Sequence, residues 1–268
     1  MRRWPSGAFG ALVVATIAAF FIVQHLKVSL PLINGDPLPL PAAFNPIGGD
    51  PGPGEPAVCR HRQPDGRIVA VDYRRTYITF YLQNRAAHVD VQIVTGAGRV
   101  VRTLVRNYYM PVDRRNPPGA FVWNGRENDG RLAPAGTYFY RVTLLELGRQ
   151  VLIDRPIAII TTAPRPAIVR LAPASVPAGG RVRITYSGAG GDRNQLLLYR
   201  GSRLVKAFAV PSRRTSAVWN GLIGGAPAAP GEYAVALRAI DAACNVGSYP
   251  RSLPPAPGQA PVLQVRQP

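Results

Sequence analysis

The 268-residue sequence is poor in the side chains that build catalytic and metal centres. It contains three histidines, two cysteines and 14 acidic residues, and these groups are scattered along the chain. Enzymatic catalysis needs a nucleophile, a base or a metal ion held in place by its neighbours. The sequence has no Ser-His-Asp spacing, no His/Cys metal cluster and no phosphate-binding loop. This scarcity argues against an enzyme, and we expect no catalytic residue, metal, cofactor or small-molecule substrate.

A sustained helical period is also missing after residue 33. The chain has 27 glycines and 28 prolines, and 47% of its residues are still hydrophobic. Many turn-forming residues combined with a normal apolar fraction indicate short strands rather than helices. The composition therefore predicts an all-β protein.

Acidic residues are too few to balance the basic ones, and the formal net charge is +18. A basic exterior attracts anionic lipid headgroups, wall polymers or nucleic acid. The alternatives are an ordinary soluble surface rich in arginine and arginines packed against strands, and we expect no nucleic-acid partner. Arginine doublets and nearby tyrosines are the candidate ligand or anion contacts: Arg74, Arg75, Tyr108, Tyr109, Arg114 and Arg115.

The one long apolar run lies near the N-terminus, from Gly7 to Val23, and two arginines precede it. As a helix it spans about 25 Å, and a short extension covers a bilayer core of about 30 Å. A single lysine follows the run before Arg60, so the positive-inside rule places the N-terminus in the cytoplasm and the rest of the chain outside. Residues 1–33 are therefore predicted as a signal anchor that crosses the cell membrane once. A cleaved signal peptide and a cytosolic protein are the alternatives.

The two cysteines, Cys59 and Cys244, lie 185 residues apart. An oxidising compartment outside the cytoplasm allows a disulfide between them, provided that the two ends of the globular part meet. In the alternative, Cys244 is a buried strand residue and Cys59 is a free thiol near a linker.

Prolines are concentrated on both sides of the globular part. Proline lacks an amide donor and fixes φ, so a segment rich in it forms neither a helix nor a central strand. Residues 34–58 are predicted as an extended, semi-rigid stalk, and residues 251–268 as a loose Pro-rich tail.

Between these segments, apolar and polar residues alternate over short runs separated by turn signals every 8–12 residues. This pattern predicts a β-sandwich, because alternate side chains of a strand face opposite sides of the sheet. The residues predicted to face the core include Ile78, Phe80, Leu82, Val89, Val91, Ile93, Tyr138, Tyr140, Val142 and Leu144.

An internal repeat divides this region into two. AVWNGLIGGAPAAPGEYAVALRAI (217–240) matches FVWNGRENDGRLAPAGTYFYRVTL (121–144), and their Trp-Asn-Gly steps lie 96 residues apart. Two copies at this spacing predict two tandem sandwiches of immunoglobulin size, residues 59–163 and 164–250. The structural motif of the two copies consists of Trp123, Asn124, Gly125, Gly130, Gly136, Tyr138, Trp219, Asn220, Gly221, Gly231 and Tyr233.

The first copy has the pattern Gly-x-x-Val-Arg-x-Leu, from Gly98 to Leu104, followed by Trp-Asn-Gly-x-Glu-x-x-Gly-x-x-x-Pro-x-Gly-x-Tyr, from Trp123 to Tyr138. It resembles the immunoglobulin-like (Ig-like) domain of the bacterial flagellar hook-capping, or hook-assembly scaffold, protein. The second copy keeps the Trp-Asn-Gly, Pro-Gly and Tyr steps. The resemblance implies a β-sandwich and a role in adhesion, spacing or assembly.

Two polar stretches need a separate interpretation. Asn124 to Gly130 resembles a calcium loop, but Arg126 takes a position that requires an oxygen ligand, and the second copy, NGLIGGAPA, has almost no side chains that carry oxygen. The stretch is therefore predicted to form tight turns, with the repeat's glycines at positive φ. SGAGGD (187–192) is predicted as a hairpin loop rather than a phosphate cradle, because no helix start follows it.

These observations predict a membrane-anchored, non-enzymatic, extracytoplasmic protein that presents two Ig-like domains for contact with a protein or the cell envelope. Adhesion, scaffolding and spacing are the roles considered. The alternative is a module that binds carbohydrate or an anionic wall polymer through Tyr108 and Tyr109, in a long loop predicted over 105–120. An enzyme of unrecognised type is the remote alternative.

Overall fold

The computed structural model describes residues 16, 33–34, 38–48, 59–62, 68–83, 85–112, 121–190, 193–211 and 214–267. Strands dominate these residues, and η1 (Leu145–Leu147) is a single 3-10 turn. Within the described ranges, no helix is long and apolar enough to cross a membrane. The predicted span from Gly7 to Val23 lies outside the described residues except for Thr16.

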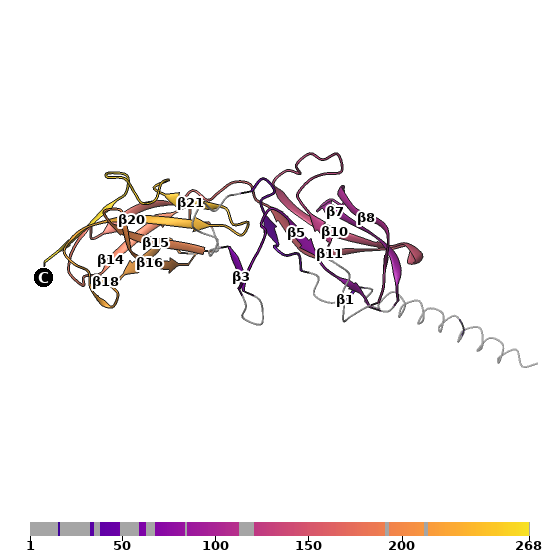
Figure 1. Cartoon of the computed structure of the whole chain (residues 1–268), viewed down its shortest axis with the longest axis horizontal. Helices are drawn as coiled ribbons and strands as arrows, with labels where there is room; N and C mark the ends of the chain where they lie inside the picture. The colour runs from indigo at the N-terminus through magenta and orange to yellow at the C-terminus, as the bar shows by residue number, and fades with distance from the viewer. Residues whose placement is uncertain are drawn as a thin grey trace, which may run out of the picture.

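The chain folds into two β-sandwiches that lie end to end (Figure 1). In the first sandwich, the larger sheet has the order β2 (Ala43–Phe44), β11 (Arg149–Ile159), β10 (Gly136–Leu144), β7 (Ala87–Thr95), β8 (Val100–Met110). Packed against it are two short pairs, β5 (Thr76–Ile78) with β9 (Phe121–Trp123) and β1 (Ile33–Asn34) with β6 (Tyr81–Leu82).

The second sandwich repeats this arrangement. Its larger sheet has the order β13 (Ser175–Pro177), β22 (Val262–Arg266), β20 (Gly231–Ile240), β15 (Arg193–Arg200), β16 (Arg203–Val210), with β21 (Val246–Tyr249) also paired to β20. The opposing sheet is β12 (Ala167–Ala172), β14 (Val182–Ser187), β17 (Ser216–Trp219). A short pair, β18 (Leu222–Ile223) with β19 (Ala226–Pro227), also belongs to the second sandwich. A separate pair, β3 (Arg60–Arg62) with β4 (Ile68–Ala70), lies outside both sandwich sheets. The chain crosses from β14 to β15 in the other sheet, so the predicted hairpin at SGAGGD is wrong.

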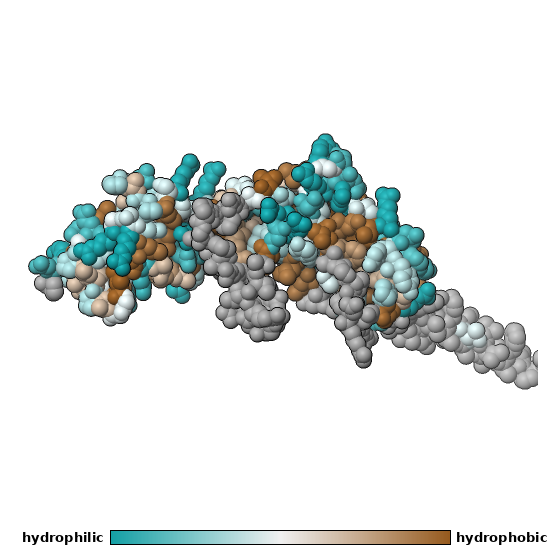
Figure 2. All heavy atoms as spheres, viewed as in Figure 1, coloured by the Kyte–Doolittle hydropathy of each residue, from teal (hydrophilic) through white to brown (hydrophobic). Residues whose placement is uncertain are grey.

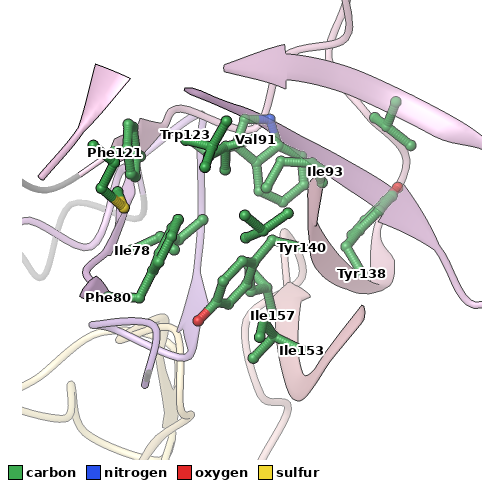
Figure 3. Close-up of a cluster of buried hydrophobic side chains, with 14 of the residues drawn as sticks. Ile78, Phe80, Val91, Ile93, Phe121, Trp123, Tyr138, Tyr140, Ile153 and Ile157 are labelled. Atoms are coloured by element: carbon green, nitrogen blue, oxygen red, sulfur yellow. The ribbon is translucent and has the colours of Figure 1, made fainter. Parts of the chain in front are cut away.

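Alternation along the strands builds both cores. All ten residues predicted to face the core of the first sandwich are buried, and they belong to one hydrophobic cluster. Figure 3 shows Trp123 beside Val91 and Ile93, with the Tyr138 hydroxyl pointing away from the cluster. The expectation of an all-β, Ig-like double sandwich is confirmed for the described residues.

Residues 38–48 belong to the first sandwich, so the prediction of a stalk over 34–58 is wrong for this part. Leu40 forms an antiparallel bridge with Tyr77, and β2 pairs in parallel with β11. Phe44 is completely buried, and its ring lies 5.4 Å from that of Trp123. Proline is tolerated in edge strands because it needs no partner for a backbone N–H. The edge strand β2 is held in place by the burial of Phe44.

The C-terminal segment is also part of the fold. β22 pairs with β20 and β13, and Leu263 and Val265 are buried in the second core. The segment between β21 and β22 places Leu253 against Leu197, Tyr199 and Ala236 on the outer face of the large sheet. The prediction of a loose tail over 251–268 is therefore wrong.

The repeated motif forms the same hydrogen bonds in both sandwiches. The indole N–H of Trp123 donates to the carbonyl of Arg126 at 3.0 Å, and that of Trp219 donates to the carbonyl of Leu222 at 3.1 Å. Each sandwich also has a tyrosine corner. The hydroxyl of Tyr138 donates to the Pro134 carbonyl at 2.6 Å, and that of Tyr233 donates to the Ala229 carbonyl at 2.7 Å.

Candidate functional site

In the stretch 124–130, the side chains of Asn124 and Asp129 form hydrogen bonds that stabilise its turns. The side-chain oxygen of Asn124 accepts from the amide of Arg126 at 3.3 Å, and Asp129 accepts from the amide of Arg131 at 3.0 Å. The glycines after them have φ of 73° and 84°, as the turn interpretation predicted. These carboxylate and amide groups therefore shape the loop.

The junction between the sandwiches is a buried polar network. Asn245 donates through its side-chain amide to the Ile160 carbonyl and to Asp241, both at 2.8 Å. Its side-chain oxygen accepts from the amide of Asn45 at 2.7 Å. Asn45, Asp241 and Asn245 are each at least nine-tenths buried. Buried amides that satisfy one another in this way fix a single relative placement of the surfaces that carry them.

A disulfide reinforces the same junction. Cys59 is bonded to Cys244, with their Cα atoms 5.8 Å apart. The two cysteines pack in a small apolar cluster with Tyr73, Ile240 and Val246. In Figure 1, β3, which begins directly after Cys59, lies between the two sandwiches. The covalent and hydrogen-bonded contacts together join the sandwiches into one unit.

The predicted anion contacts are not brought together. Arg74 and Arg75 lie in the turn before β5, and both pair with Asp72. This turn is close to the junction, since Tyr73 belongs to the junction cluster. Arg114 and Arg115 lie outside the described residues.

Tyr108 and Tyr109 lie on the edge strand β8, so the long loop predicted over 105–120 is wrong at its start. Their exposed fractions are 39% and 59%. Tyr109 pairs with His88 of β7, and the two rings are 5.4 Å apart. Glu146 of η1 accepts from the His88 backbone N–H at 2.9 Å and lies 2.6 Å from its Nδ1. We call His88, Tyr108, Tyr109 and Glu146 the β8 patch.

Glu146 is the acidic residue of the patch, and its pKa is lowered by its contacts with His88. Hydrogen bonds from the His88 side chain and then from its backbone lower the pKa of Glu146 to about 2. Because the folded pKa is below the usual value of 4.5, this contribution to stability is present at neutral pH. It is lost as the pH falls from about 4.5 towards 2. The Glu146 carboxyl group is therefore ionised at every physiological pH.

The edge of β8 is protected against pairing with another strand. Its register with β7 shifts at three places. Asn128 covers the first part of the edge, because its N–H donates to the Val101 carbonyl at 3.0 Å and its side chain accepts from the Thr103 N–H at 2.9 Å. Bulges and covered edges prevent strand addition. We therefore expect contacts of the β8 patch to use the exposed side chains of Tyr108 and Tyr109.

The outer faces of the two large sheets carry residues of different polarity at equivalent positions of the repeat. In the second sandwich, the outward Leu197 and Ala236 are apolar and lie under Leu253. At the equivalent positions of the first sandwich stand Gln92 and Arg141, which are joined by a hydrogen bond of 2.7 Å. The first face is hydrophilic enough to remain open to solvent. Figure 2 shows hydrophilic and hydrophobic residues intermixed on the visible side of both sandwiches.

Comparison with protein-family models found no match, and comparison with curated proteins found none either. Several solved structures are similar to the chain. The FN1–FN3 domains of chicken CNTN1 match with 14% identity over 72% of this chain and 61% of that one, with a TM-score of 0.39. The ligand-binding domain of human OSCAR matches with 14% identity over 87% and 94%, with a TM-score of 0.34.

A C-terminal fragment of intimin, in complex with the intimin-binding domain of its translocated receptor, matches with 13% identity over 65% and 56% and a TM-score of 0.28. The chain spans about six-tenths of the length of the CNTN1 structure. At these identities the likeness concerns the fold alone, so the function is argued from the residues of this chain.

Sequence reasoning identified the two cysteines and the two exposed tyrosines but missed the junction amides. Asn45 and Asn245 are 200 residues apart, and each lies in a stretch without a motif. The edge cover by Asn128 was missed for a related reason, since its partners on β8 lie about 25 positions away along the chain. The predictive signal in such cases is burial of an amide side chain, which the sequence does not show.

Proposed function

We propose that this protein is a membrane-anchored, extracytoplasmic, non-enzymatic protein that binds a protein partner through its first sandwich. The β8 patch is the observation that carries this proposal. Two neighbouring tyrosines are exposed on a strand whose backbone edge is protected. Tyrosine is favoured at protein interfaces because it buries a large apolar ring and keeps a polar tip.

The junction supports a role as a spacer or scaffold. A disulfide and buried hydrogen bonds hold the second sandwich in place against the first. A partner bound to the first sandwich would therefore be held at a defined distance from any partner of the second. A likeness to the hook-capping Ig-like domains fits this role and remains part of the proposal.

The location outside the cytoplasm rests on two features. The apolar run after two N-terminal arginines favours a single membrane span with the sandwiches outside. A disulfide that joins two parts of the fold is typical of an oxidising compartment. Both features are those expected of a protein of the cell envelope.

Carbohydrate or wall-polymer binding is the second candidate function. The ring of Tyr109 lies beside that of His88, and the carboxylate of Glu146 contacts His88. An exposed ring with a neighbouring carboxylate can stack on a sugar and accept its hydroxyls. This function predicts retention on purified cell wall that is lost in Tyr108→Ala/Tyr109→Ala.

Position-specific photo-crosslinking in the native membrane tests the main proposal. A benzophenone amino acid replaces Tyr109, and the control carries it at Val169, a residue of β12 that is 64% exposed. We expect a discrete protein adduct from position 109 and none from position 169. Equal adducts from the two positions, or none from either, would exclude the β8 patch as the contact surface.

A further inference from the structure

The second sandwich has an edge strand of a different kind from β8. β16 is the last strand of its sheet, and within the described residues no strand pairs with its outer side. From Lys206 to Val210 its register with β15 is regular, residue by residue, and the one shift comes before Lys206. A regular edge presents a row of backbone donors and acceptors to any strand that approaches it.

Side chains beside this edge leave room for another strand. Ala207 and Ala209 are small and exposed on the outer face of the sheet. On the inner side, Val205 and Phe208 are only partly buried, and they pack on the second core together with Ala217 of the opposing sheet. Apolar side chains of an added strand would extend this core at its open side.

Lys206 selects which strand can be added. It pairs with Leu198, a core residue, so its side chain lies on the inner face and is half-buried. β16 carries Arg203 and Lys206 and no acidic residue. A neutral strand, or β16 of a second copy, would cover Lys206 without a counter-charge, and inward cations on edge strands prevent such pairing.

We propose that β16 accepts an extended acidic segment of a partner protein as an additional strand, with an Asp or Glu opposite Lys206 and an apolar residue opposite Phe208. The backbone of the partner completes the hydrogen bonds of the edge, and its acidic residue pairs with the lysine. The net charge of +18 on this chain favours the approach of an acidic partner and opposes pairing between copies.

Hydrogen–deuterium exchange of the full chain tests the proposal with two synthetic peptides. The first is acetyl-Thr-Val-Thr-Glu-Thr-Val-Thr-amide, which places a valine opposite Phe208 in either strand direction, and the second has Lys in place of Glu. We expect the Glu peptide to slow exchange of amides in 206–210 at least tenfold and to leave β8 unchanged. The Lys peptide should have no effect at the same concentration.

A charge reversal distinguishes recognition from general attraction. Lys206→Glu should weaken binding of the Glu peptide at least tenfold and allow the Lys peptide to bind. Arg106→Glu, which removes an exposed cation from β8, is the matched control and should leave both results unchanged. Equal effects of the two reversals would overturn the proposal, as would protection of amides elsewhere than β16.

Pairing of β16 with a second copy would also overturn it. In that case sedimentation would show a dimer without peptide, and Lys206→Glu would change the amount of dimer. The outcome is separate from that of the proposed function, since crosslinking from position 109 concerns the other sandwich.

Discussion

Trp123 and Tyr138 show how single residues build this fold. The two rings lie 5.1 Å apart in an edge-to-face arrangement, and Phe44, from the N-terminal edge strand β2, packs against the tryptophan. Trp219 and Tyr233 repeat the pair in the second sandwich, 6.2 Å apart. Glu127 and Asp129, which lie between Trp123 and Tyr138, have no acidic residue at the equivalent positions of the second copy. The retained residues are thus those that fill the core or close a turn.

Trp123→Ala should lower the free energy of unfolding by about 3–5 kcal/mol, because the side chain is completely buried. Glu127→Ala should change it by less than about 0.5 kcal/mol, since its half-buried side chain forms no hydrogen bond or ion pair with the described residues. Denaturant unfolding of the two variants beside the parent protein measures both values. Equal losses for Trp123→Ala and Glu127→Ala would show that the stretch is not the structural frame.

At the scale of elements, strand faces follow from local pattern while edge strands do not. Ile78, Phe80 and Leu82 could be assigned to the core because alternation is a property of neighbouring residues. β2 and β22 lie in segments rich in proline, and each is a strand only because a distant strand accepts it. The path of residue 253 over the second sheet depends in the same way on the apolar face beneath it.

Asn128→Ala tests the cover over β8. The substitution removes the acceptor of the Thr103 amide and should lower stability by about 0.5–1.5 kcal/mol. Amide exchange should become faster at Thr103 and remain the same at Val94 in the neighbouring buried strand. Unchanged exchange at Thr103 would mean that Asn128 does not protect the edge.

At the scale of the whole molecule, the junction fixes how the two sandwiches are placed relative to each other. Asn45, Cys59 and Ile160 from one side meet Cys244 and Asn245 from the other. The repeat predicted two domains, because each copy carries its own core residues. Their mutual placement could not be predicted, since it depends on side chains up to 200 residues apart that meet only in the folded chain.

The oxidation state of Cys59 and Cys244 in protein from its native cells tests the central claim of two locked sandwiches outside the cytoplasm. Cells are quenched in acid, and the denatured protein is treated with a thiol-alkylating reagent before and after reduction. We predict no alkylation before reduction and two labels after it. Two labels without reduction would contradict both the covalent junction and the proposed extracytoplasmic location.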